Sequence, residues 1–419
     1  MSRRYFGTDG VRGIVGEELT PELVEQIGKA ATLWAAGGRV LVGRDTRGSG
    51  PNLEQAVAHG IASAGGTAVL GGVLPTPAVA LLADDLGIVV SASHNPPEYN
   101  GVKLFRGGGK LVDEQEEEIE ALFDASAPGG GSIESREDAT ATYLDHVIAH
   151  FGSDLTGLRI GVDCANGAFS EIAPHAFTQL GAEVHTIGAE PDGSNINVDC
   201  GATDLRALQQ LVTSESLDLG VAFDGDGDRM LAVDERGEPV DGDQIIAVLA
   251  LHLGVDLVAV TVMTNLGFHR LMAERHIEVV TTPVGDRYVL EALRREGGVL
   301  GGEQSGHLIW LGDHVTGDGL VAALLLCSAV RGRDVSDAVA VMPRYPQVTR
   351  NIRMAHPIIS GAVLAEVDRL NETLGEGGRV LVRPSGTEPV VRVLAEAENA
   401  ADAENLCASI AALVERELG

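Results

Sequence analysis

At 419 residues the chain is too long for a single hydrophobic core, which predicts several domains of roughly 100 to 150 residues each. Hydrophobic residues make up 44% of it, a share that excludes an intrinsically disordered protein. Its net charge of −31 argues against nucleic acid or an anionic membrane as a partner, because the summed field would repel both. Salt screens exposed charge beyond about 8 Å, so a few converging arginines can still make one cleft locally positive.

The first part of the chain alternates helix-like and strand-like patterns. Helices are predicted at Pro21 to Trp34 and Leu53 to Ala64, and strands at Arg39 to Gly43, Thr67 to Leu70 and Gly87 to Ser91. This rhythm is typical of a mostly parallel sheet covered on both faces. An acidic helix is predicted at Asp113 to Phe123, followed by a glycine-rich linker at Ala127 to Ser132.

The same alternation of strands and helices occurs twice more along the chain, and the order of elements then changes. Further strands are predicted at Leu158 to Asp163, Glu183 to Ile187, Leu217 to Phe223, Leu257 to Met263, Ile277 to Thr281 and Val299 to Gly301. After Pro343 we expect a smaller α+β domain with an extended segment Tyr345 to Met354, a helix Ile358 to Leu374, strands Arg379 to Arg383 and Val390 to Glu396, and a helix Ala400 to Leu418. The predicted domains are residues 1–138, 139–240, 241–343 and 344–419.

Cysteine usage and the absence of apolar targeting segments indicate a cytoplasmic protein. Cys164, Cys200, Cys327 and Cys407 are far apart and without CxxC spacing, which favours reduced thiols that act as small core residues. The sequence has no apolar run of about 18 residues, and its first residues have no hydrophobic signal region.

Ser93 ends an apolar run and is followed at once by His94-Asn95-Pro96. Ligands of open α/β sheets gather at the carboxyl ends of strands, which makes this hydroxyl a candidate nucleophile. A loop hydroxyl that merely caps a neighbouring amide is the alternative.

Asp224, Asp226 and Asp228 alternate with glycines on one tight loop, so that their carboxylates can converge on a cation. A calcium EF-hand is excluded, because Arg229 stands at the sixth position of the loop where glycine is needed and a strand-like run precedes the loop. A small set of hard oxygen ligands suits Mg²⁺ that also binds a phosphoryl oxygen. A solvated acidic turn is the alternative. A phosphoserine at position 93 would need this cation, because it adds a charge of about −1.5 to −2.

Four more segments carry polar side chains suited to binding a phosphate or a sugar. Arg383-Pro384-Ser385-Gly386-Thr387 offers the parts of a phosphate-binding loop, or it is an ordinary turn. Glu303 and Ser305, two residues apart, would point the same way if extended and suit adjacent sugar hydroxyls, or they are loop residues. His307 is a candidate proton shuttle or a locally satisfied histidine.

In the opening Phe6 to Gly13 segment, Arg12 is the better candidate for contact with a phosphoryl group, whereas Arg44 or Asp45 equally fits a structural ion pair.

The order of five motifs resembles the α-D-phosphohexomutases across essentially the whole chain. These are Phe6 to Gly13, Ser91-Ala-Ser-His-Asn-Pro96, Asp224-Gly-Asp-Gly-Asp-Arg229, Gly302-Glu-Gln-Ser-Gly-His307 and Arg383-Pro-Ser-Gly-Thr-Glu-Pro389. The resemblance implies an α/β fold of three successive doubly wound mixed-sheet α/β domains plus a smaller C-terminal α+β domain, heart-shaped with a central cleft. The opening motif, the Glu-Gln-Ser wording and Val284-Gly-Asp-Arg-Tyr288 are most similar to bacterial members that act on glucosamine phosphates.

The resemblance also implies a role for each matching residue. Ser93 would be the phosphoserine, and its phosphoryl oxygen would bind one Mg²⁺ together with the three aspartates. Arg12, His94 and Lys103 would surround the transferring phosphoryl, with Lys103 or His307 moving a proton. Arg229 would lie beside the metal loop, Glu303 and Ser305 would bind sugar hydroxyls, and Arg383, Ser385, Gly386 and Thr387 would hold the other phosphate.

The implied reaction interconverts glucosamine 6-phosphate and glucosamine 1-phosphate through a glucosamine 1,6-bisphosphate that is also the activator. The implied partners are the hexosamine phosphate and a priming kinase, unless Ser93 autophosphorylates, with the chain a monomer or homodimer. Phosphomannomutase or phosphoglucomutase activity is the nearest alternative. A metal-dependent phosphatase and a noncatalytic sugar phosphate sensor are the others.

Overall fold

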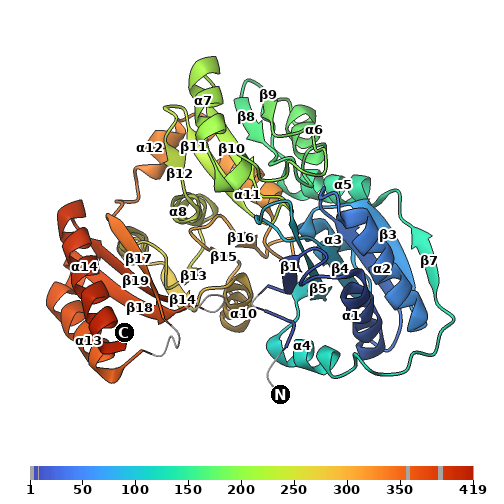
Figure 1. Ribbon diagram of the computed structural model, residues 1–419. Helices are drawn as coiled ribbons and strands as arrows, with labels where there is room; N and C mark the ends of the chain where they lie inside the picture. Colours follow the sequence, from blue (N-terminus) through green and yellow to red (C-terminus); the bar gives the residue numbers. More distant parts are fainter. Residues whose placement is uncertain (1–3, 8, 355–358, 386–389, 419) are drawn as a thin grey trace. The chain divides into compact units, whose positions relative to one another are not determined.

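The computed structural model describes residues 4–7, 9–354, 359–385 and 390–418 (Figure 1). It divides into two compact units, of which the first comprises Met1–Val262 with Glu278–Ala340 and the second comprises Met263–Ile277 with Val341–Gly419. Among the described helices none is long and apolar enough to cross a membrane. The limits of the four predicted domains stay a prediction.

A seven-stranded mixed sheet opens the first unit. Its order is β1 (Val11–Ile14), β5 (Tyr99–Arg106), β4 (Leu86–Val90), β2 (Arg39–Arg44), β3 (Thr67–Val73) and β7 (Ser132–Ser135), with β6 (Gly109–Lys110) beside β5. Strand β2 is parallel to both β3 and β4, whereas β5 is antiparallel to β4 and β1. The helices of this part are α1 (Pro21–Trp34), α2 (Gly50–Ser63), α3 (Thr76–Leu82) and α4 (Asp113–Glu120).

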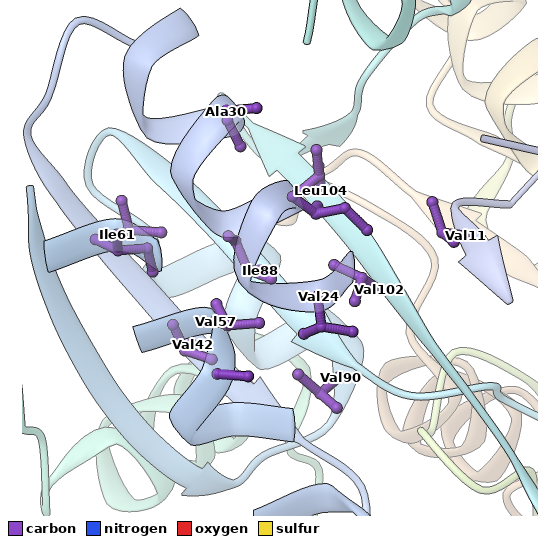
Figure 2. Close-up of a cluster of buried hydrophobic side chains, with 14 of the residues drawn as sticks. Val11, Val24, Ala30, Val42, Val57, Ile61, Ile88, Val90, Val102 and Leu104 are labelled. Carbon is purple, nitrogen blue, oxygen red and sulfur yellow. The ribbon is translucent and has the colours of Figure 1, made fainter. Parts of the chain in front are cut away.

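Successive residues of β2 point to opposite faces of the sheet, and helices cover both faces. Val40 and Val42 join the buried cluster with residues of α1 and α2, some of which are drawn in Figure 2. Gly43 faces the other side, where an added Cβ would lie 2.5 Å from Val79 of α3. Helix α1 begins after Thr20, whose hydroxyl accepts the Leu23 amide, so the local cap and the apolar face agree.

Two smaller mixed sheets complete the first unit. The second sheet has the order β12 (Pro239–Val240), β11 (Met230–Asp234), β10 (Leu219–Phe223), β8 (Arg159–Asp163) and β9 (Glu183–Ile187). The third has the order β14 (Glu278–Thr282), β13 (Leu257–Thr261), β15 (Leu300–Gly302) and β16 (Leu308–Trp310). Their helices are α5 (Ala139–Phe151), α6 (Ile172–Gln179), η1 (Gly201–Thr203), α7 (Arg206–Glu215), α8 (Gly242–Leu253), α10 (Asp286–Glu296), α11 (Gly319–Ala329) and α12 (Val335–Val339).

The second unit has a three-stranded antiparallel sheet in the order β17 (Gln347–Arg353), β19 (Val390–Ala397) and β18 (Gly378–Pro384). Its helices are α9 (Leu266–Glu274), α13 (Gly361–Leu374), η2 (Gly375–Gly377) and α14 (Ala400–Leu418). One buried apolar cluster joins this sheet to α13 and α14. The predicted change from alternating α/β order to a smaller α+β arrangement is confirmed.

The glycine-rich segment predicted as a linker is tied to the first sheet. Gly129 and Gly131 donate amide hydrogen bonds to the carbonyls of Ser63 and Ala62 at the end of α2. Ser132, the last residue of the predicted linker, already begins β7, which pairs with β3 in parallel. The four residues of β7 are all exposed, so the strand lacks the apolar alternation by which a sequence indicates a strand.

Candidate active site

Strand β4 ends at Val90, and the loop that follows places Ser93 in the left-handed region, with φ +52°. Its side chain is 1% exposed. The Ser93 hydroxyl donates a hydrogen bond of 2.5 Å to Asp224 Oδ2 and lies 3.2 Å from Nδ1 of His94. The structure therefore brings the candidate nucleophile onto the aspartate loop, across 131 residues of sequence.

The aspartate loop is the tight turn between β10 and β11. Asp224 Oδ1 accepts hydrogen bonds from the amides of Gly227, at 3.1 Å, and Arg229, at 3.2 Å, which closes the loop on itself. Gly227 has φ +78°, a conformation that glycine adopts without steric cost. Oxygens from Asp224, Asp226 and Asp228 come within 4.8 Å of one another, and all three side chains are buried.

Electrostatics favour a cation among these carboxylates. Burial first, and then the nearby Asp228 and Asp226, raise the pKa of Asp224 to about 8. Oδ1 of Asp226 and Oδ1 of Asp228 are buried without a hydrogen-bond partner among the described residues. A buried carboxylate oxygen without a hydrogen bond is costly, and hard divalent cations prefer oxygen ligands. The three aspartates therefore fit a magnesium ion.

Lys103, on β5, neutralises part of this negative charge. Its Nζ lies 2.7 Å from Asp226 Oδ2, 3.2 Å from Asp228 Oδ2 and 3.4 Å from Asp9 Oδ2, and the side chain is 1% exposed. Burial by itself would lower the pKa of Lys103, but the three carboxylates outweigh burial and raise it well above its ordinary value. Lys103 is therefore a permanent cation in the metal-free site.

Sequence reasoning missed a second group of charges beside this site. Nζ of Lys110 lies 2.5 Å from Asp9 Oδ1 and 2.5 Å from Asp286 Oδ2, and Asp9 also pairs with Arg12. Two signals were available, because Asp9 and Asp286 lie inside segments typical of the resembling family and lysine is rare in this acidic chain. Neither signal says that these residues meet, because 101 and 176 residues separate the paired groups.

Three other candidate residues surround the trio. His307 Nδ1 lies 3.7 Å from Asp228 Oδ1, and His307 Nε2 lies 3.4 Å from Asp286 Oδ2. Burial opposes the charge on His307, but Asp286 and Asp228 together raise its pKa above the ordinary value. Arg229 Nε lies 3.8 Å from Asp228 Oδ1. Burial and then the charges of Arg229 and Arg12 lower the pKa of His94 to about 4, so His94 is neutral at pH 7.

Glu303 and Ser305 lie in a turn, so the extended backbone that would point both side chains the same way is absent and the loop alternative describes this segment. The Gly306 amide donates to the Glu303 carbonyl at 3.0 Å and the Glu303 amide to the His307 carbonyl at 2.9 Å, so this segment is a tight turn between β15 and β16. Glu303 Oε1 accepts the Gly285 amide at 3.0 Å, while Ser305 is exposed. The alternation that holds in a strand does not apply to residues in a turn.

The predicted phosphate-binding loop lies in the second unit. Arg383 is the last residue but one of β18, directly opposite Arg392 of β19, and the Ser385 amide donates to the Val390 carbonyl at 2.9 Å. Two cationic side chains thus stand at the strand ends beside this loop. Gly386 and Thr387 lie outside the described residues.

A buried hydroxyl hydrogen-bonded to a carboxylate trio, with cations around it, is suited to phosphoryl transfer, in which charge neutralisation supplies most of the catalysis. Four family models match the chain in order, described as phosphoglucomutase/phosphomannomutase α/β/α domain I (residues 3–128), domain II (141–237), domain III (241–345) and C-terminal domain (347–413). The chain belongs to the phosphoglucomutase/phosphomannomutase family, within the phosphohexomutases.

Relatives and solved structures agree with this assignment. Phosphoglucosamine mutase of Pelotomaculum thermopropionicum is 49% identical, over 94% of this chain and 95% of its own, and that of Thermoanaerobacter sp. (strain X514) is 43% identical over 99% of both. A phosphoglucomutase/phosphomannomutase family protein of Burkholderia thailandensis matches with a TM-score of 0.84 at 25% identity, over 98% of both chains. The fold is also that of Aspergillus fumigatus N-acetylphosphoglucosamine mutase in complex with GlcNAc-6P and magnesium (TM-score 0.72, 19% identity, 99% of this chain and 96% of that one).

Proposed function

We propose that this chain is a phosphoglucosamine mutase, which interconverts glucosamine 6-phosphate and glucosamine 1-phosphate. The observation that carries the proposal is the 2.5 Å hydrogen bond from the buried Ser93 hydroxyl to Asp224, a member of the carboxylate trio. Curated relatives of that name are 43 to 49% identical over nearly the full chain, and they support glucosamine phosphates over other hexose phosphates.

In the proposed working enzyme Ser93 carries a phosphoryl group. Asp224, Asp226 and Asp228, with an oxygen of that group, would hold one Mg²⁺, as their convergence and the partnerless oxygens of two of them suggest. When bound, the ion neutralises charge on the phosphoryl oxygens and on the serine oxygen that leaves.

The first half-reaction moves the phosphoryl group from Ser93 to the O1 hydroxyl of glucosamine 6-phosphate. The bond from phosphorus to the serine oxygen breaks, a bond from phosphorus to O1 forms, the O1 proton passes to a base, and the serine oxygen gains a proton. The product is glucosamine 1,6-bisphosphate. This intermediate then reverses its orientation and returns its 6-phosphoryl group to Ser93, leaving glucosamine 1-phosphate.

The charge of each surrounding residue indicates its proposed role in phosphoryl transfer. Lys103 and Arg229, whose pKa values the carboxylates raise against the effect of burial, stay cationic and balance the moving phosphoryl group, with Arg12 beside them. His307 is assigned to proton transfer, since it lies between Asp228 and Asp286, whose charges raise its pKa above the ordinary value. Neutral His94, 3.2 Å from the hydroxyl, orients Ser93 without adding charge.

Substrate recognition is assigned to the loops of the third sheet and the second unit. Glu303 and Ser305 would bind sugar hydroxyls from the turn between β15 and β16. Arg383, Ser385, Gly386 and Thr387 would hold the phosphate that is not transferred, which must be either the 6-phosphate or the 1-phosphate. Cytoplasmic location, the route by which Ser93 is first phosphorylated and the oligomeric state stay predictions.

The test is the substitution Ser93→Ala with a coupled assay on glucosamine 6-phosphate. Removing the only atom that can carry the phosphoryl group should abolish nearly all turnover, while sugar phosphate binding stays measurable by calorimetry. Ser63→Ala is a matched control, because the Ser63 hydroxyl donates to the Gly60 carbonyl at the end of α2, away from the aspartates. Turnover near the parent rate in Ser93→Ala would end the phosphoserine mechanism.

Phosphorylation and specificity are measured on the same protein. Intact mass with site mapping should find one phosphate on Ser93 after incubation with glucosamine 1,6-bisphosphate. Side-by-side assays on glucosamine, glucose and mannose phosphates should rank glucosamine first, and a higher rate on either of the others would move the chain to the alternative mutase activity. Release of inorganic phosphate without need of the bisphosphate would indicate a phosphatase instead.

A further inference from the structure

The guanidinium of Arg47 is fully buried and holds the serine loop by its backbone. Nη2 donates to the carbonyls of Ser93, at 2.9 Å, and Asn95, at 2.7 Å, while Nη1 donates to those of Tyr99, at 3.0 Å, and Pro96. One planar fork with several fixed donors is suited to such a set, and a lysine ammonium is not.

Asp45 sets the orientation of this guanidinium and closes a second path to the serine. Asp45 Oδ2 accepts from Arg47 Nε at 2.9 Å and from the Ser91 hydroxyl at 2.6 Å. The same Ser91 oxygen accepts the backbone amide of Ser93 at 2.9 Å. Both the amide and the carbonyl of Ser93 are therefore tied to the Asp45–Arg47 ion pair.

Asn197, in the loop between β9 and η1, holds the serine loop from the opposite side. Its Nδ2 donates to the carbonyl of Ser93 at 2.9 Å and to that of Asn95 at 3.1 Å, the same two oxygens that Arg47 Nη2 binds. Asn197 itself is anchored by its amide, which donates to the Ala165 carbonyl after β8 at 2.9 Å. Each of the two carbonyls thus accepts one hydrogen bond from each side.

The hydrogen bonds from Arg47 and Asn197 both reach Ser93, whose backbone is strained. Ser93 has φ +52°, and a residue other than glycine in that region persists only when its surroundings determine its conformation, at a cost of order 1 to 3 kcal/mol. The hydroxyl must serve as donor and acceptor in two successive transfers, and catalytic geometry tolerates little displacement.

We propose that Arg47 and Asn197 are positioning residues for phosphoryl transfer, which clamp the Ser93 backbone so that its hydroxyl stays on the aspartate trio through both half-reactions. Neither side chain is placed against the sugar or the moving phosphoryl group, so each acts through Ser93. The inference rests on the proposed mutase function and assigns residues that serve it.

The substitution Asn197→Gly tests the positioning role of Asn197. Asn197 has φ +58°, which glycine adopts without strain, so this change removes the two amide hydrogen bonds and leaves the backbone conformation accessible. We expect kcat to fall by about 10- to 100-fold, the loss that a displacement near 1 Å produces, with KM for glucosamine 6-phosphate little changed. Single-turnover transfer from phosphorylated enzyme to the sugar should slow by the same factor.

Arg47 is tested in the double variant Asp45→Asn/Arg47→Met, because removing the arginine alone would leave a buried carboxylate without its ion-pair partner. Thr32→Val serves as control, since Thr32 is buried and its hydroxyl donates to the Gly28 carbonyl within α1, away from the serine loop. Melting temperatures are recorded for every variant, so that loss of folded protein is separated from loss of rate.

A slowed single turnover in folded Asn197→Gly protein, with unchanged KM, would support the proposal. Single turnover at the parent rate would overturn it, as would a loss of rate that merely tracks the unfolded fraction. If the parent enzyme itself fails to convert glucosamine phosphates, the proposed function falls. An active parent with a fully active Asn197→Gly variant overturns only the positioning roles.

Discussion

Gly225, in the aspartate loop, lies close against the Ser93 carbonyl of the serine loop, and we predict that Gly225→Ala impairs both stability and turnover. A Cβ atom at this position would lie 2.7 Å from the Ser93 carbonyl oxygen, 2.8 Å from Asn197 Nδ2 and 2.8 Å from Ile196 Cδ1. Gly225 is not among the residues with positive φ, so alanine can adopt its backbone conformation. The expected effect is therefore steric.

The distances set the magnitude. Favourable contacts between carbon atoms lie at about 3.5 to 4.0 Å, so the new methyl group overlaps its neighbours by roughly 1 Å. Overpacking a buried site costs about 1 to 3 kcal/mol. Ile196 Cδ1 is a flexible end that can move, but the Ser93 carbonyl is held by Arg47 and Asn197. We expect the upper part of that range, with the Ser93 hydroxyl displaced from Asp224.

Thermal melting and steady-state kinetics together measure this effect. The family domain that contains Gly225 spans residues 141–237, and in a domain of about 100 residues each kcal/mol lowers the melting temperature by about 4 to 8 °C. A fall of several degrees or more is therefore expected, together with a kcat loss of about tenfold or more. Gly361→Ala is the control, because a Cβ at Gly361 meets nothing within 4 Å. If Gly225→Ala melts and turns over like the parent, the close approach of the two loops is not as tight as the structure indicates.

Three further predictions concern charge. Since the metal-free fold raises the pKa of Asp224 from its ordinary 3.8 to about 8, the stability linked to its protonated form is complete below pH 3.8 and is lost as the pH rises through 8. Chelation of Mg²⁺ should therefore lower the melting temperature more at pH 8.5 than at pH 6, and equal shifts at both pH values would contradict this. Lys103→Met should destabilise the metal-free protein by about 3 to 5 kcal/mol in denaturant titrations, because it removes the ammonium that lies 2.7 Å from Asp226 Oδ2 and 3.2 Å from Asp228 Oδ2 in a buried site. Added Mg²⁺ should restore part of that stability, and a melting curve unaffected by the substitution would refute the role of Lys103. Arg383→Ala should weaken calorimetric binding of glucosamine 6-phosphate without lowering the melting temperature much, and an unchanged affinity would make this loop an ordinary turn.

Most regular elements were predictable because their signals are local. Helix α1 begins at Pro21 and ends at Trp34 as predicted, since a threonine cap, a proline in the first turn and one apolar face all act within a few residues. The exposed strand β7 was not predicted, because its four residues, Ser132 to Ser135, include a single apolar side chain and give no periodic pattern. For Glu303 to His307 the sequence left an extended segment and a loop open, since hairpin geometry depends on the partner strand β16.

The sequence by itself determined which chemical groups this protein possesses: a serine after a buried strand, three aspartates spaced by glycines, and five motifs in family order. Only the tertiary structure decided which of these groups meet. Ser93 reaches Asp224, Lys110 bridges Asp9 and Asp286, and Arg47 binds the Ser93 carbonyl. Such contacts join residues dozens to more than a hundred positions apart. Their energies depend on burial and on distance in space, and a local pattern of residues encodes neither quantity.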